Sequence, residues 1–489
     1  MRTKRMPRIR SAVAPLASRA TTMLAARVAL VAAVTLAQLA SGQSLAAQAT
    51  LQDQEVTVLT LRDALTRAAE NNPEYRQALN RLELEGPQYR QALGAFFPDL
   101  RVSYGTGQSM QRELSWVDFD GTPITNPEPR TVTTSRSNQS ASLGVDLFQG
   151  GRRFHELGRA RAQARVDRHG SQRDLNRVLA EVQRQFLVAQ RHRLRLAVEE
   201  DLLAARERDY VVAERRFELV ATGRSDVLGA ELELERQRVT VTDIRGQVEK
   251  AMLALRSAIG DPSLGALDVQ QPLPEPIDPA TLDLGALVAR ALRESPTVAA
   301  AEAAVAVSQS NLSAQKATRW PSLSLSSSIS RGSFGPDQSS LFKFNPEGFN
   351  GGLSLSVSIP LFTRFQTSQS IASANIELRN ARETIRQTEI EVDELIRSRY
   401  VDLETAWANV RQRSRELEVA SERLEIVREE YRLATKSIED LRTAIRDEAS
   451  ARRDSVDQRF EFAVFLVGLY EAAGIVGREA GLEAEPEGN

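Results

Sequence analysis

One pattern of residues occurs twice in this chain, at a nearly constant spacing of a little over two hundred positions. Pro73 recurs as Pro296, 223 positions later, whereas Asp226 recurs as Asp440, 214 positions later. The spacing changes within one stretch, about residues 98 to 147, where a connecting loop would tolerate the difference in length. Two copies of one structural unit are therefore the simplest interpretation.

Residues 1–49 have the organisation of a secretory signal. Basic residues at the start precede an apolar run, Val28 to Leu39, and Ala47-Gln48-Ala49 is a small-residue cleavage site. The run is too short to cross a bilayer as a helix, although a retained anchor remains the alternative. Loss of this segment removes seven basic residues and no acids, which changes the formal net charge from -2 to -9. An acidic mature chain is a poor candidate for binding nucleic acid.

The composition also limits the chemistry of this chain. It contains no Cys and only three His, which excludes disulfides, thiolate metal sites, a lipid anchor on cysteine and a cysteine nucleophile. His155, His169 and His192 lack the paired spacing of a zinc site. No nucleophile, metal cluster or phosphate-binding loop is apparent in the sequence. We therefore expect that the protein is not an enzyme and binds no metal and no cofactor.

Each copy changes from helical to strand periodicity. Short helices are predicted over residues 60–94 and 283–319, and alternating apolar and polar residues then predict two strands per copy. Each strand has about ten residues, a length that fits a tilted transmembrane strand. The predicted strands are about 98–106, 139–148, 321–331 and 351–362.

Four such strands cannot close a membrane barrel. Open sheet edges are not tolerated in lipid, and known barrels begin at about eight strands. Several chains would therefore have to pool their strands. A soluble hairpin packed on helices is the alternative, since an antiparallel sheet with one wet face has the same pattern.

Two long helical hairpins are predicted after the strands, at about 151–260 and 364–474. About seventy residues of helix would reach roughly 105 Å. Apolar residues at intervals of seven, such as Leu196 and Val241 in the first copy and Leu403 in the second, supply the lateral support of a coiled coil. The first copy therefore covers residues 50–260 and the second 282–474. A Pro-rich linker is expected over 261–281 and a loose tail over 475–489.

The hairpin turns are expected near residues 221–226 and 434–440. In the first turn Gly223 is a natural helix C-cap, and Ser225 or Asp226 a natural N-cap. The second turn has no Gly, so a single unbroken helix is the competing interpretation.

This order of elements resembles the TolC-like outer-membrane efflux proteins over essentially the whole mature chain. The similarity begins at the Leu-Xaa-Asp-Ala-Leu motif of Leu61 and consists of helix, aromatic-Pro, strand, strand, long helix, turn and return helix, twice. The resemblance implies a mainly helical, internally duplicated chain with four transmembrane strands. These would join those of two other copies in a homotrimeric, twelve-stranded outer-membrane barrel, continued into the periplasm by a helical tunnel.

The resemblance also implies a function without chemistry. Such a channel-tunnel is a passive duct that receives its substrates from a periplasmic adaptor (membrane fusion protein) and an inner-membrane pump of the RND, ABC or MFS type. A periplasmic coiled-coil adaptor or scaffold without a membrane barrel is the alternative.

Site residues are implied at the two turns, which would be the periplasmic tips of the tunnel. In family members a second-turn aromatic residue and a basic residue bond to a first-turn aspartate of a neighbouring copy, and this holds the mouth shut. The matching residues are Tyr431, Lys436 and Asp226, while Asp440 matches a carboxylate that forms a ring at the aperture. The adaptor is expected to dock at Val220, Gly223, Ser225, Ala434 and Ser437.

The turns also depart from the family pattern. Val220 and Ala434 stand where the family has Gly, Lys436 replaces an Arg, and Thr443 occupies a second acidic position. Since Lys cannot pair with a carboxylate in the bidentate way of Arg, the closed state is expected to be looser. Ordinary capping and solvation of the helix ends is an equal alternative for Asp226, Lys436 and Asp440.

Aromatic residues and prolines mark the predicted boundaries between strands and helices. This placement suits an interfacial aromatic girdle at the junction of barrel and tunnel, and plain packing at the junction is an equally good interpretation. The residues are Phe97, Pro98, Phe148, Trp320, Pro321 and Phe362.

Overall fold

The computed structural model describes residues 57–113, 120, 122–123, 125, 129–219, 223–335, 348–433 and 435–476. The predicted signal segment and the turn residues Val220 and Ala434 lie outside these ranges. The described residues form two units. The smaller holds residues 57–58 and 263–268, where β1 (Thr57–Val58) pairs in parallel with β4 (Leu267–Asp268).

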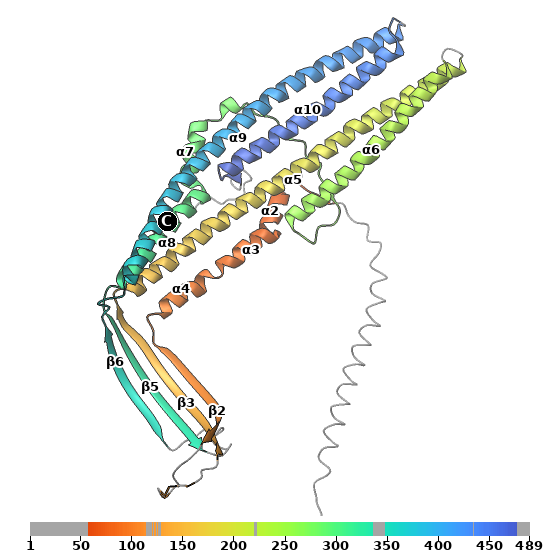
Figure 1. Cartoon of the computed structure of the whole chain (residues 1–489). Helices are drawn as coiled ribbons and strands as arrows, with labels where there is room; N and C mark the ends of the chain where they lie inside the picture. The colour runs from red at the N-terminus through yellow and green to blue at the C-terminus, as the bar shows by residue number, and fades with distance from the viewer. Residues whose placement is uncertain are drawn as a thin grey trace, which may run out of the picture. The chain divides into compact units, whose positions relative to one another are not determined.

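The larger unit shows short helices, two strands and a long helical hairpin, and then the same order again (Figure 1). The first series is α2 (Leu61–Asn71), α3 (Pro73–Leu82), α4 (Glu85–Gly94), β2 (Asp99–Glu113), β3 (Arg130–Gln149), α5 (Arg152–Glu218) and α6 (Arg224–Ile259). The second is η1 (Pro279–Thr281), α7 (Leu284–Glu294), α8 (Pro296–Ala317), β5 (Ser322–Gly335), β6 (Phe349–Ser358), α9 (Gln366–Arg432) and α10 (Ile438–Ala472).

A pair of residues in the left-handed backbone conformation precedes the long helix in each of the two series. Gly150 and Gly151, before α5, have φ values of 60° and 82°, and Arg364 and Phe365, before α9, have 50° and 65°. Only glycine adopts this left-handed conformation without strain. At Gly150 a side chain would also be too close to the Ala317 carbonyl oxygen, which would lie 2.5 Å from an added Cβ. The turn into α5 therefore requires glycine, whereas the turn into α9 accepts a strained backbone.

The sheet of the larger unit has the order β2-β3-β5-β6, and every neighbouring pair is antiparallel. Leu100 lies opposite Leu143, and Leu325 lies opposite Leu355. Since opposite residues of an antiparallel pair share a face, the register gives the sheet one apolar and one polar face. The apolar face carries Leu100, Val102, Leu143, Val145, Leu323, Leu325, Leu353, Leu355 and Val357, and the polar face carries Ser103, Ser140, Ser142, Ser324, Ser326, Ser328, Ser354 and Ser356.

The strands differ from the predicted ones at their ends. Pairing of β2 with β3 continues as far as Glu113 and Arg130, beyond the predicted limits of 106 and 139. These outer parts are mostly polar on both faces, so the sequence shows no alternation of apolar and polar residues there. In contrast, β6 ends at Ser358 and not at 362 as predicted, because Pro360 has no N–H for a ladder hydrogen bond.

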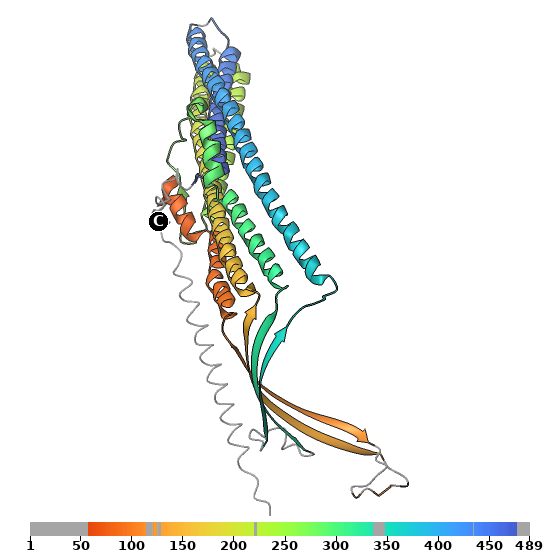
Figure 2. The ribbon, with the colours of Figure 1, turned by 90° about the vertical axis from the view of Figure 1, so that its left-hand side faces the viewer.

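The two hairpins contain the longest helices, α5 and α9, which have 67 residues each and would measure about 100 Å. Figure 1 shows the long helices side by side in the order α6, α5, α10, α9, and in the view of Figure 2 they overlap. Shorter helices cover the strand-proximal half: α8 packs on α5 and α9, and α2, α3 and α4 pack on α5. None of the described helices has the length and apolar content needed to cross a bilayer.

The core consists of the seams inside each hairpin. Leu196 of α5 packs with Val241 and Ile244 of α6, and Leu403 of α9 belongs to a cluster with Phe462 of α10. These are the residues predicted to repeat every seven positions or the partners they meet, as coiled-coil packing requires. The second cluster also includes Ile475, so the predicted loose tail cannot begin at 475, because this apolar side chain is buried.

Ion pairs and hydrogen bonds also join the two hairpins to each other. Arg184 of α5 pairs with Glu471 of α10 at 2.6 Å. Arg453 of α10 pairs with the buried carboxylate of Glu199 at 3.2 Å, and that carboxylate also accepts a hydrogen bond from Gln237 of α6 at 2.8 Å. Each hairpin is thus joined internally by apolar packing, whereas several ion pairs, together with the packing of Leu202 on α9 and α10, join the two hairpins.

Candidate functional site

The first hairpin turn joins the end of α5 to the start of α6. The predicted C-cap role of Gly223 is wrong: its φ of -77° and ψ of 157° are extended, and it is the N-cap of α6. Ser225 and Asp226 are not N-caps either, because both lie in the first turn of α6. The Asp226 N–H donates to the Gly223 carbonyl at 3.0 Å. The negative charge of Asp226 at this position complements the helix dipole.

The second turn separates α9 and α10, so the alternative of one unbroken helix is wrong. No glycine is needed because Thr435 donates from both its N–H and its hydroxyl to the Glu430 carbonyl, at 2.9 and 2.8 Å. Ser437 and Asp440 then form a capping box. The Asp440 carboxylate accepts from the Ser437 hydroxyl and N–H at 2.7 and 3.1 Å. These hydrogen bonds lower the pKa of Asp440.

Among the residues that the structure describes, Tyr431 is the predicted gate residue for which a hydrogen bond to the other hairpin is recorded. Arg216 of α5 donates a hydrogen bond to the Tyr431 hydroxyl, and its guanidinium lies 4.9 Å from the centre of the Tyr431 ring. Asp226 lines the same cavity as Tyr431. Lys436 is exposed in the turn. Tyr431 and Asp226 therefore line one cavity, and the structure adds Arg216 to them. The resemblance placed Arg216 at the start of the first tip and gave it no gating role.

The cavity between the ends of the two hairpins has a volume of about 370 Å³. Its apolar wall includes Val212, Ile438 and Leu441. Burial raises the pKa of Asp209. The positive charge of Arg206, whose guanidinium lies 3.8 Å from the carboxylate, acts in the opposite direction. Three basic and three acidic residues line this space, which suits contact with another protein surface more than with a strongly charged ligand. They are Arg206, Arg216, Arg442, Asp209, Asp226 and Glu233.

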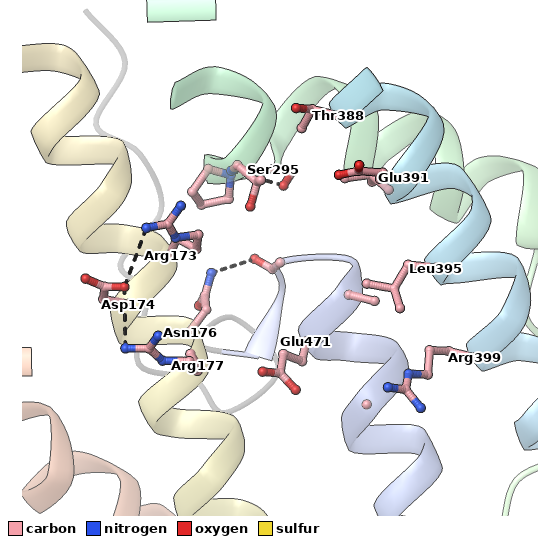
Figure 3. A pocket seen from close by; sticks show the side chains of 16 residues that line it. Arg173, Asp174, Asn176, Arg177, Ser295, Thr388, Glu391, Leu395, Arg399 and Glu471 are labelled. Carbon is pink, nitrogen blue, oxygen red and sulfur yellow. Dashed lines mark hydrogen bonds and ion pairs between the residues drawn. The ribbon is translucent and has the colours of Figure 1, made fainter. Parts of the chain in front are cut away.

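A second cavity of about 420 Å³ lies where α5, α8, α9 and α10 meet (Figure 3). Asp174 lies between Arg173 and Arg177, at 3.8 and 3.6 Å. Asn176 donates to the Gly474 carbonyl at 3.1 Å, which ties α5 to the end of α10. Asp174 also pairs with Arg81 of α3 at 3.0 Å. Because Asp174 and the Asn176 amide nitrogen each join α5 to a neighbouring segment, we interpret the space as a packing junction.

The junction residues lie where the prediction placed them in sequence, next to the strand ends. Phe97, Phe148, Trp320 and Phe362 are all exposed, while Pro98 and Pro321 immediately precede β2 and β5. Sequence reasoning missed Arg153, whose guanidinium holds this region together. It donates to the Ala95 and Leu147 carbonyls at 3.2 and 2.9 Å and lies 5.0 Å from the ring of Phe96. No pattern of residues distinguished it from the other arginines of α5.

The part of the chain that the structure covers contains no recognisable metal site. No group of three or more His, Asp or Glu residues among the described positions could hold a metal ion. The turns, the adjoining cavity and the two-faced sheet are therefore the candidate functional features.

Long paired helical hairpins joined to a small antiparallel sheet are the architecture of outer-membrane channels. The crystal structure of the CmeC outer membrane channel of Campylobacter jejuni matches with a TM-score of 0.65 at 14% identity, over 85% of this chain and 85% of that one. The open state of the MtrE outer membrane channel of Neisseria gonorrhoeae matches with a TM-score of 0.63 at 19% identity, over 85% and 88%. At these identities the likeness concerns the fold.

The chain itself belongs to the outer membrane efflux protein family, which matches residues 64–261 and again residues 287–474. It is 26% identical over 433 residues to protein CyaE of Bordetella pertussis, covering 88% of this chain and 86% of that protein. It is 24% identical over 401 residues to the cation efflux system protein CusC of Escherichia coli K12, covering 77% and 83%. The predicted family is confirmed, and with it a non-enzymatic protein of outer-membrane efflux.

Proposed function

We propose that this protein is an export duct of the outer membrane, built from three copies of the chain. The duplicated halves of each copy supply four strands to a shared twelve-stranded barrel and two hairpins to a periplasmic tunnel. Substrates would enter from a periplasmic adaptor and an inner-membrane pump, and residues 1–49 would direct export. The observation that carries this proposal is the two-faced, open sheet.

The sheet has the properties of a barrel segment and not of a finished structure. Its apolar face is open, as the 73% exposure of Leu353 and the 62% exposure of Leu355 illustrate. The opposite face is dominated by serine. Lipid outside and water inside would match the two faces. The edge strands β2 and β6 each pair on one side only among the described residues, and pairing of β6 with β2 of the next copy would remove both edges.

The helices support the same head-to-tail arrangement. In the row of long helices, α6 and α9 occupy the two ends. Each carries a second apolar stripe with seven-residue spacing that its own hairpin does not cover: Leu232 and Val239 on α6, and Val419 and Ile426 on α9. A contact between α6 of one copy and α9 of the next would bury both stripes. Such a heterologous contact closes into a ring when the rotation is right.

The hairpin turns would form the gated mouth of the tunnel and receive the adaptor. Asp226, Tyr431 and Lys436 would contribute to closure, and the Asp440 carboxylates of three copies would lie near the aperture and attract cations. Adaptor contacts are proposed at Val220, Gly223, Ser225, Ala434 and Ser437. The near-neutral cavity beside the turns, with its apolar wall, is suited to such a protein contact. The exposed junction aromatics would lie at the interface of lipid and water.

Reconstitution tests this function directly. The mature full-length chain is purified from the outer-membrane fraction in mild detergent and added to a planar lipid bilayer. We expect stepwise conductance increases of uniform size, produced by a species that resists dissociation until it is heated. A soluble monomer that leaves the bilayer conductance unchanged would rule out the duct.

A further inference from the structure

α4 and the beginning of α5 lie side by side next to the strands (Figure 1), and their contacts change in chemistry along the helix axis. Closest to the strands, the rings of Phe96 and Phe154 meet edge to face with centroids 5.1 Å apart, and Phe154 is 67% exposed. Seven residues further from the strands on each segment, Arg161 donates a hydrogen bond to the Tyr89 hydroxyl at 3.2 Å. The Arg161 guanidinium also lies 5.5 Å from the centre of the Tyr89 ring. An aromatic level is thus followed by a level that is half aromatic and half charged.

The next level along the axis is ionic. Another seven residues further on α5, Arg168 donates from two nitrogens to the Glu85 carboxylate, at 3.0 and 2.7 Å. The contacts therefore change from aromatic to charged over the fourteen residues from Phe154 to Arg168, about 21 Å of helix. A membrane interface changes in the same order, because aromatic rings lie at the edge of the hydrocarbon and a headgroup layer of about 5–8 Å separates them from water. This part of α4 and α5 has the polarity gradient of a segment that leaves a bilayer.

Two arginines of α5 follow the exposed ring of Phe154 on the same face of the helix. Arg161 lies about 10 Å further along the axis and Arg165 about 6 Å beyond it, two and three turns from Phe154. Side chains of a helix lean toward its N-terminus, and the N-terminus of α5 is the end joined to β3, so both guanidiniums reach back toward the strands. Both arginines are exposed, and neither forms an ion pair among the residues that the structure describes. A guanidinium without a carboxylate partner is suited to bidentate binding of a phosphate.

The segments around these arginines carry an excess of positive charge. Four stretches adjoin the strand ends, residues 83–98, 150–168, 310–321 and 359–379. They contain eleven Lys and Arg and five Asp and Glu, a net charge of 11 - 5 = +6. The complete chain has a formal net charge of -2, so positive charge is concentrated next to the strands. Basic residues at a membrane surface attract anionic lipids.

We propose that Arg161 and Arg165 form a binding site for the phosphate of an anionic phospholipid in the periplasmic leaflet of the membrane. The proposal rests on the duct function, which places the sheet in the bilayer and the start of α5 on its periplasmic side. Phe154 contacts the lipid next to its headgroup, and Tyr89 orients the Arg161 guanidinium toward the phosphate. Bound lipid would then set how deep the barrel lies in the bilayer.

The test measures lipid binding to the full-length protein by native mass spectrometry, with phosphatidylglycerol and phosphatidylcholine of the same acyl chains as probes. We expect phosphatidylglycerol to bind more tightly. Arg161→Gln and Arg165→Gln should each weaken its binding about fivefold, the factor that corresponds to about 1 kcal/mol, and should leave phosphatidylcholine binding unchanged. Arg208→Gln is the matched control, since Arg208 is exposed near the opposite end of α5. Inorganic phosphate should not compete with phosphatidylglycerol, because it has no acyl chain to contact Phe154.

Two further outcomes would overturn the lipid site. One is equal binding of the two lipids by the wild-type protein, and the other is a change of channel conductance in Arg161→Gln with unchanged lipid binding, which would place the arginine in the lumen. Either result, obtained with a wild-type protein that conducts, leaves the duct standing. A wild-type protein that forms no channel would instead overturn the duct. Heat-resistant oligomer on gels shows that each variant is folded.

Discussion

Arg195 of α5 and Asp457 of α10 form an ion pair 2.9 Å long in the middle of the contact between the two hairpins. Beside it, His192 Nδ1, Arg195 Nε and Asp457 Oδ1 are buried without a hydrogen bond among the residues that the structure describes. Buried polar groups with incomplete partners reduce stability. The plane between the hairpins should therefore be easier to disturb than the apolar seams within them.

Acid should disturb this plane through His192. Burial lowers the pKa of His192 below its ordinary 6.5, Arg191 and Arg195 lower it further, and Asp457 opposes them. The unfolded chain thus takes up this proton at a higher pH than the folded chain, so stability is lost as the pH falls below about 6.5. We expect the midpoint of thermal unfolding to fall less between about pH 7.5 and 5 in His192→Gln than in wild type. His155→Gln is the control, and equal losses in all three proteins would contradict the assignment.

The buried seam of the second hairpin should tolerate truncation poorly. Leu403 is 0% exposed, whereas Val401, two residues away on α9, is 57% exposed. Leu403→Ala should lower the free energy of unfolding by about 2–5 kcal/mol, because it loses packing and leaves a cavity. Val401→Ala should change it by no more than about 0.5 kcal/mol. Urea unfolding followed by helical circular dichroism measures both, and similar losses would show that the seam is assigned to the wrong face.

The capping box should control the order of the second turn. Ser437→Ala removes the hydroxyl that accepts from the Asp440 N–H at 3.1 Å, a loss of about 0.5–2 kcal/mol. Amide hydrogen exchange in the first turn of α10 should accelerate in this variant and stay near the wild-type rate in Ser437→Thr, which keeps the oxygen. Unchanged exchange in Ser437→Ala would mean that the turn is held by other contacts.

The two faces of the sheet should respond differently to charge. Leu355, opposite Leu325, lies on the proposed lipid face, and its neighbour Ser356, opposite Ser324, lies on the other. Arginine facing lipid near the bilayer centre costs about 2–4 kcal/mol per chain. Leu355→Arg should therefore reduce the heat-resistant oligomer in the outer-membrane fraction, while Ser356→Arg should assemble and reduce cation conductance. Equal assembly of the two variants would argue against lipid on the apolar face.

Sequence periodicity was informative where one face of an element is buried. The seven-residue repeats that contain Leu196 and Leu403 correspond to the seams of the hairpins, since burial leaves a regular trace in the sequence. The outer parts of β2 and β3 are mostly polar on both faces and show no such periodicity. The two strands extend to Glu113 and Arg130 because they pair with each other there. The residue pattern of a single strand carries no information about this pairing.

The turn chemistry was harder to predict because several residue types can end a helix. Gly223 was expected to end α5, but it begins α6, and Thr435 satisfies the carbonyl that a glycine turn would otherwise expose. The partner of Tyr431 was unpredictable for a different reason. Arg216 and Tyr431 lie 215 positions apart and meet only when the two hairpins pack side by side. The resemblance to the family predicts which positions belong to a gate, but the contact that Tyr431 makes depends on how the two hairpins pack.

The number of chains in one particle tests the central claim most directly. Single-particle imaging of the full-length protein in lipid nanodiscs should show three copies around one continuous twelve-stranded barrel, with β6 of each copy hydrogen-bonded to β2 of the next. A particle that contains one copy, with both sheet edges unpaired and no barrel, would contradict the account.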